Sequence, residues 1–164
     1  MGMIIYLRRA SPSDIARFTA DASGWEEFAF EEGEDRLDLI DFDKAWHALH
    51  FMLTGGADNT ENPLGILAQD EEKFGADENG FGGFAVISPE RMKAFDLALK
   101  ELDDQTLASR YDPVAMDAND IYMADVFADD GDEAFEYVTQ GVPDLRQFAS
   151  RCAQSGDGAL RILS

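Results

Sequence analysis

The fold of this chain is best judged from one stretch of sequence, Asp43-Lys44-Ala45-Trp46-His47-Ala48-Leu49-His50-Phe51-Met52-Leu53-Thr54-Gly55. Its apolar residues occupy nearly every angular position around a helix, and a helix that is apolar all round is normally buried on more than one side. Asp41 or Asp43 suits the N-cap, and Gly55 suits the position that follows the last helical turn. The stretch therefore predicts a largely buried helix over residues 43–54.

Three short apolar segments outside that helix have the composition of buried β-strands. They cover residues 3–8, 83–88 and 158–163. Because helical patterns separate them, tight hairpins cannot join them, and the expected sheet is mixed or parallel. The pattern predicts a small sheet covered by helices in an α/β fold, with α+β as the alternative. A chain of 164 residues is expected to form a single domain over 1–164.

The charge of the chain is its most unusual bulk property. It has 34 acidic and 13 basic residues, a formal net charge of −21. Such a chain repels phosphates, so neither nucleic acid nor an anionic membrane is an expected partner, and no apolar run approaches the ~20 residues of a membrane helix. The simplest interpretation is a solvated acidic surface. The functional alternative is a surface that binds a basic protein.

Cys152 is the only cysteine, which excludes an intrachain disulfide and suits a reducing, cytoplasmic location. It shares an apolar helical stripe with Leu145 and Phe148, a pattern that predicts a buried, inert thiol and not an activated nucleophile. The sequence also lacks the G-x-S-x-G motif of serine hydrolases. Nucleophilic catalysis therefore has no support in the sequence.

The two histidines, His47 and His50, are three residues apart, a spacing that two metal ligands on one helix can have. A zinc site needs three or four ligands, and the sequence offers neither a third histidine nor a cysteine pair. We therefore predict no metal site and no cofactor. His50 alone suits a general acid or base. A lone histidine in an apolar helix nevertheless favours a buried residue that is satisfied by its neighbours.

The pattern Lys44-x-Trp46-x-x-x-His50-Phe51-x-x-Thr54-Gly55 resembles the YfbM-like family of small bacterial proteins of unknown function. Further resemblance comes from Met1-Gly2-Met3, Pro63-Leu64, Ile121-Tyr122 and the terminal helix-Gly-strand pattern. The resemblance implies a compact, three-layer-like α/β domain in the bacterial cytoplasm. It implies no activity, because the family has none established.

Two hypotheses about function follow. The first is a non-catalytic acidic binding module for a basic protein, with a candidate partner surface at Asp129, Asp130, Asp132 and Glu133. The pattern predicts that these four acids surround one helix N-terminus, where their charge is favourable. The alternative is a small-molecule-binding enzyme or sensor, with a pocket around His50 and Trp46 and with His50 as the candidate catalytic residue. The candidate binding residues of that pocket are Lys44, Trp46, His50, Thr54, Tyr6 and Tyr122.

Overall fold

The computed structural model describes residues 2–57, 61–68, 72–75 and 82–164. These residues form an α+β domain around one sheet, with the strand order β2-β1-β5-β4-β3. The strands are β1 (Ile5–Ala10), β2 (Leu39–Asp41), β3 (Lys73–Phe74), β4 (Phe84–Ile87) and β5 (Gly158–Leu163). The two ends of the chain meet at this sheet, because Ile4 and Ser164 exchange backbone hydrogen bonds of 2.9 Å.

Each pair of neighbouring strands is antiparallel, so the expected mixed or parallel sheet is wrong. The long connections between the three predicted strands, now β1, β4 and β5, exclude tight hairpins among them, but a connection that contains helices can bring the next strand back in either direction. Strand β5 has the expected bounds, 158–163, whereas β1 lies two residues later than expected, at Ile5–Ala10. The edge strands β2 and β3 were not predicted, since segments of three and two residues carry no readable period.

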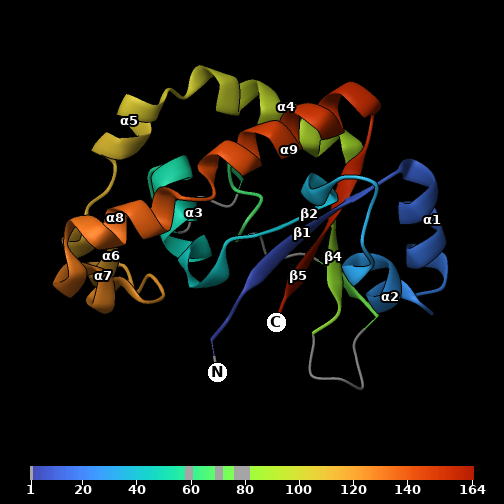
Figure 1. Cartoon of the computed structure of the whole chain (residues 1–164), viewed down its shortest axis with the longest axis horizontal. Helices are drawn as coiled ribbons and strands as arrows, with labels where there is room; N and C mark the ends of the chain where they lie inside the picture. The colour runs from blue at the N-terminus through green and yellow to red at the C-terminus, as the bar shows by residue number, and fades with distance from the viewer. Residues whose placement is uncertain (1, 58–60, 69–71, 76–81) are drawn as a thin grey trace.

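Helices contact both faces of the sheet (Figure 1). On one face, α1 (Pro12–Ala20) and α2 (Trp25–Phe30) enclose a small apolar cluster. Its buried members are Ala10, Phe18, Trp25, Ala29, Phe84, Leu160 and Ile162. The other face carries the larger core, which includes α4 (Pro89–Glu101) and α9 (Val142–Ser155). Helices α4 and α9 pack on each other and on β5.

The helix predicted at residues 43–54 is present. It consists of a 3-10 turn, η2 (Asp43–Ala45), followed by α3 (Trp46–Thr54), and it ends at Gly55 with a φ of 81°. Its residues Ala48, Leu49, Met52 and Leu53 are fully buried in the larger core. The prediction of a largely buried helix is confirmed, although Trp46 itself is partly exposed.

Short helices extend the larger core beyond α3, at the left of Figure 1. They are α5 (Asp104–Ser109), α6 (Pro113–Ala118), α7 (Ala124–Asp130) and α8 (Asp132–Thr139), and a further 3-10 turn, η1 (Arg36–Asp38), precedes β2. Helix α8 packs on α3, and α7 packs on both α6 and α8. Among the described residues, no helix is both long enough and apolar enough to cross a membrane.

Candidate functional site

His50 has no exposed surface, and its contacts hold the end of its own helix. Its Nε2 atom lies 3.2 Å from the carbonyl oxygen of Ala57. One turn later, the Thr54 hydroxyl lies 2.9 Å from the carbonyl oxygen of His50 and 2.8 Å from that of Gly56. His50 and Thr54 therefore fix the turn in which the chain leaves α3, and neither residue lines the two cavities described below.

Three other predicted binding residues come together around the start of the chain. The Trp46 indole donates a hydrogen bond of 3.0 Å to the Met3 carbonyl, and the Met3 amide donates one of 3.2 Å to the Tyr122 hydroxyl. A side chain at Gly2 would collide with the Lys44 stem. Lys44, Trp46 and Tyr122 thus contact the chain's own N-terminal segment, which gives Gly2 and Met3 of the family-like start a structural reason, whereas Met1 lies outside the described residues.

His47 joins the same cluster. Its Nδ1 atom accepts a hydrogen bond of 3.0 Å from the Tyr122 amide, and its ring stacks on Trp46 at 4.9 Å with an angle of 15° between the ring planes. The Trp46 ring in turn stacks on Tyr122 at 6.3 Å. This stack connects α3 to the segment that leads into α7.

Tyr6 lies apart from His50. It packs edge-on against Phe30 at 5.3 Å, with the small cluster under α1 and α2, whereas His50 lies in α3 on the other face of the sheet. In the sheet register Tyr6 is opposite Asp41. Burial, followed by the charges of Asp41 and Asp43, raises the pKa of Tyr6. The predicted binding residues therefore do not share one pocket.

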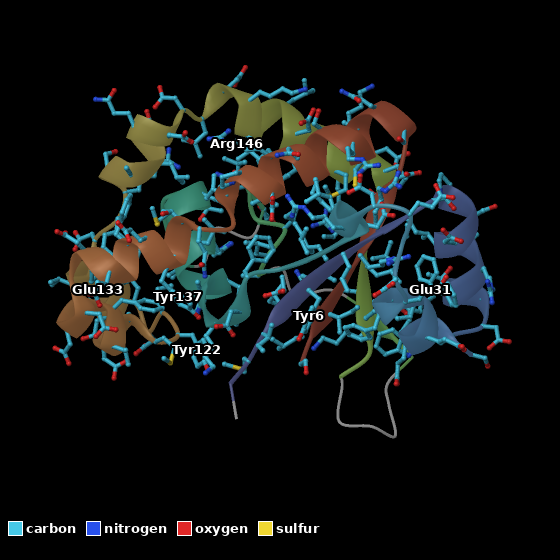
Figure 2. The ribbon with its side chains drawn as sticks, in the orientation of Figure 1. Tyr6, Glu31, Tyr122, Glu133, Tyr137 and Arg146 are labelled. Carbon is cyan, nitrogen blue, oxygen red and sulfur yellow. The ribbon has the colours of Figure 1, made fainter. Side chains whose placement is uncertain are left out.

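The helix formed by η2 and α3 is called the central helix below. A polar cavity of about 250 Å³ lies beside its start, between β2 and the α8–α9 junction. Its lining residues are Asp41, Phe42, Asp43, Tyr137, Val138, Gln140, Gly141 and Asp144. Tyr137, labelled in Figure 2, donates a hydrogen bond of 2.6 Å to Asp43 and accepts one of 3.2 Å from the Lys44 amide. Burial and the Asp43 bond raise the pKa of Tyr137 to about 12. The sequence reasoning missed this cavity, because its two halves lie almost a hundred positions apart.

The segment 111–140, which contains α6, α7 and α8, lies in the longest stretch of the chain without a basic residue. It has nine acidic residues and no lysine, arginine or histidine. All nine side chains are exposed; they are Asp112, Asp117, Asp120, Asp125, Asp129, Asp130, Asp132, Glu133 and Glu136. We call this surface the acidic lobe. Within the described residues, none of the nine carboxylates forms an ion pair.

Several acids outside the acidic lobe form ion pairs. Arg9 lies 2.7 Å from Asp38 and 3.0 Å from Asp157, with both carboxylates largely shielded from solvent. Arg36, Lys100, Arg146 and Arg151 form further pairs with acids that also lie outside residues 111–140. Among the described residues, the ion pairs therefore lie outside the acidic lobe, which keeps its charge, as do the exposed acids Glu27, Glu31, Glu32 and Glu34 in and after α2.

The four predicted partner residues belong to this lobe, but their local setting differs from the prediction. The sequence pattern predicts all four around one helix N-terminus. Instead, Asp129 and Asp130 end α7, and Asp132 and Glu133 begin α8. Gly131, with a φ of 64°, separates the two helices. A carboxylate stabilises a helix N-terminus and opposes the dipole at a C-terminus. Helix stabilisation therefore accounts for Asp132 and Glu133 only.

Comparisons with known proteins agree with this fold. A family model described as a domain of unknown function, DUF1877, matches residues 1–162. The crystal structure of YfbM from Escherichia coli, a protein of unknown function, matches with a TM-score of 0.66 and 18% sequence identity, over 98% of this chain and 99% of that one. No curated protein matches. At this identity, the structural likeness shows the fold alone.

Proposed function

Because this chain belongs to the DUF1877 family and is YfbM-like, for which no activity is described, we propose a function from its own surface. The chain is a non-catalytic binding module that holds a basic protein partner. The observation that carries this proposal is the acidic lobe, with nine exposed carboxylates that form no ion pair among the described residues.

The distribution of charge supports the proposal more than its total does. Residues 111–140 contribute −9 of the net −21, since they hold nine acids and no base. A concentrated field of one sign steers an oppositely charged partner and raises its association rate, and it suppresses binding of acidic proteins. The lobe also offers an apolar contact, because Val114 in α6 is 76% exposed. Charge at the rim of an apolar contact is a common composition of protein interfaces.

His50 and Cys152 are the residue types best suited to catalysis, and the surroundings of both support a non-catalytic role. His50 is enclosed and contacts Ala57. Burial, together with the Asp157 carboxylate, raises the pKa of Cys152 to about 12, so its thiol is protonated at neutral pH. Neither side chain is placed to attack a substrate from solvent.

The test uses two variants that change the charge equally. The lobe variant carries Asp129→Asn, Asp130→Asn, Asp132→Asn and Glu133→Gln. The control variant carries Glu27→Gln, Glu31→Gln, Glu32→Gln and Glu34→Gln, at four exposed acids in and after α2. Each set of substitutions moves the formal charge from −21 to −17.

Each protein is used as bait in extracts of the native host at low and moderate salt. The proposal expects one basic protein that wild type and the control variant retain and that the lobe variant loses. Equal loss by both variants would mean that total charge, and not the lobe, decides retention. If wild type retains no basic protein, the proposal fails.

A small-molecule-binding enzyme or sensor is the second candidate. The observation that favours it is the 250 Å³ cavity lined by Asp41, Asp43, Tyr137 and Asp144, which lies beside Lys44 and not at His50. Its polar lining suits a small hydrogen-bonding molecule. A thermal-shift screen of such molecules tests it: a compound that stabilises wild type but not Asp41→Asn would favour this candidate over the binding module.

A further inference from the structure

A second cavity, of about 340 Å³, opens between α5, α8 and the start of α9. It is lined by Asp104, Leu107, Ala108, Phe135, Thr139, Val142, Pro143 and Arg146. Leu107 and Val142 are buried, whereas Phe135 and Ala108 are half-buried and Pro143 is exposed. The cavity therefore has an apolar base that solvent reaches from one side.

Arg146, labelled in Figure 2, marks the polar end of this cavity. Its guanidinium donates hydrogen bonds of 2.8 Å and 2.7 Å to the carbonyls of Leu99 and Leu102, where α4 ends, and one of 3.0 Å to Asp104. The two carbonyls hold the arginine in place, and Asp104 balances its charge. The Asp104 carboxylate is 86% exposed, so even this end of the cavity presents an acid to solvent.

Acids of the lobe border the opposite side. Asp132, Phe135, Glu136 and Thr139 have the spacing i, i+3, i+4 and i+7, which places them along one face of α8. Phe135 and Thr139 line the cavity, and Asp132 and Glu136 are exposed beside them. Burial, followed by the charges of Asp130 and Asp132, raises the pKa of Tyr111, whose ring meets Phe135 edge-on at 5.2 Å. An apolar cavity is thus bordered by carboxylates.

We propose that this cavity receives one large apolar side chain of a basic peptide segment, whose neighbouring lysines or arginines lie against Asp132, Glu136 and Asp104. This inference rests on the proposed function and names the kind of partner that the acidic lobe binds. Its argument is charge complementarity around an apolar pocket of suitable size, since 340 Å³ is near the lower end of the ~300–1,000 Å³ range of ligand pockets.

An apolar anchor gives a slow dissociation rate, which surface charge alone does not provide. Exposed charges mainly raise the association rate, whereas a buried anchor in a pocket lowers the dissociation rate and dominates affinity. The acidic lobe alone would bind any basic protein weakly. A cavity bordered by acids would select segments in which a large apolar residue lies between basic ones.

The experiment uses fluorescein-labelled lysine-rich peptides that are identical except at one central position, which is Phe, Leu, Ala or Ser. Fluorescence anisotropy gives the Kd of each peptide for wild type, for Ala108→Phe, which fills the cavity from α5, and for Ala118→Phe, a control at an exposed position of α6 that does not line it. Circular dichroism tests whether both variants are folded.

The proposal expects the Phe peptide to bind wild type about tenfold more tightly than the Ala peptide, the effect of burying one large apolar side chain. In Ala108→Phe that preference falls below about twofold while the Ala peptide binds as before, and Ala118→Phe behaves as wild type. The comparison of peptides on wild type decides the matter even if Ala108→Phe does not fold.

Other outcomes overturn the inference. Equal Kd values for the Phe and Ala peptides, still weakened in the lobe variant, would leave the acidic lobe as a binding surface and remove the cavity from it. Absence of binding by any peptide at low salt would overturn both proposals. Binding of the neutral molecule N-acetyl-phenylalaninamide as tightly as the Phe peptide would make the cavity a small-molecule site.

Discussion

Tyr137 in α8 donates its hydroxyl proton to Asp43 over 2.6 Å, which joins two residues 94 positions apart in sequence. The same hydroxyl accepts the Lys44 amide hydrogen at 3.2 Å. Asp43 has a φ of 45°, a left-handed conformation that is unfavourable for a residue with a side chain. The bond therefore stabilises a strained turn and connects the acidic lobe to the start of the central helix.

Replacing Tyr137 by Phe removes both hydrogen bonds. We expect Tyr137→Phe to lower the free energy of unfolding by about 1–3 kcal/mol, because a partly buried carboxylate and a backbone amide lose their partner. Chemical denaturation at neutral pH measures the loss. Asp43→Asn is the control, since an amide oxygen can still accept the bond; an equal loss in both variants would contradict the assigned role of the hydroxyl.

The same residue gives a pH dependence. The folded-state pKa of Tyr137 is about 12, above the ordinary 10.0, so folding favours the protonated phenol. Its stabilising contribution is fully present below pH ~10 and is lost as the pH rises toward ~12. Burial also raises the pKa of Cys152 to about 12, so both residues contribute to the loss. Tyr137→Phe should flatten the decline of stability in this interval, and an unchanged slope would contradict the assignment.

His50→Ala tests whether the central helix carries a site or a structural contact. Loss of the buried imidazole should destabilise the protein by about 1–3 kcal/mol, because the Ala57 carbonyl loses its partner and a cavity is left. His50→Gln, which keeps a donor, should lose less. Thermal melting measures both variants, with a ligand screen beside it. An unchanged melt combined with lost ligand binding would favour an enzyme or sensor.

Gly158 is a position where close packing excludes a side chain. A Cβ atom there would overlap the Ile87 carbonyl oxygen and lie 2.8 Å from Ile15 Cδ1. Gly158→Ala should therefore cost about 1–3 kcal/mol through overpacking. Gly82→Ala is the matched control, because the nearest atom to its Cβ among the described residues is the Lys73 Nζ at 3.8 Å. Equal melting temperatures for the two variants would show that β4 and β5 pack less closely than described.

Much of the fold could be predicted from short-range patterns. The central helix was readable because its apolar residues and Gly55 lie within thirteen consecutive positions, and β5 because Gly158–Leu163 is a short apolar run after a glycine turn. Strand direction was not readable, since it depends on where the intervening helices pack. The helix after Gly131 is present as α8, but Asp129 and Asp130 belong to α7, because Gly131 both ends one helix and precedes the next.

The candidate site was less predictable than the fold. The resemblance identified Lys44, Trp46, His50 and Thr54 as a group, but their contacts are with the N-terminal segment and the end of their own helix. The partners of Asp43 and Trp46 come from distant segments, so no spacing indicates them. The acidic lobe had a readable signal, because a run of thirty residues without a base is visible in the sequence.

The most direct measurement for the proposed binding role is the association rate of a lysine-rich peptide, followed by stopped-flow fluorescence from about 10 mM to about 500 mM salt, over which the Debye length falls from ~30 Å to a few ångströms. For wild type and the Glu27, Glu31, Glu32 and Glu34 control variant, the rate should be high at low salt and fall steeply. The Asp129, Asp130, Asp132 and Glu133 variant should start lower and fall less, with a nearly unchanged melting temperature. Identical rates for all three proteins, with a wild-type melting temperature that rises with salt through relief of self-repulsion, would contradict the account and make the acidity a property of solubility alone.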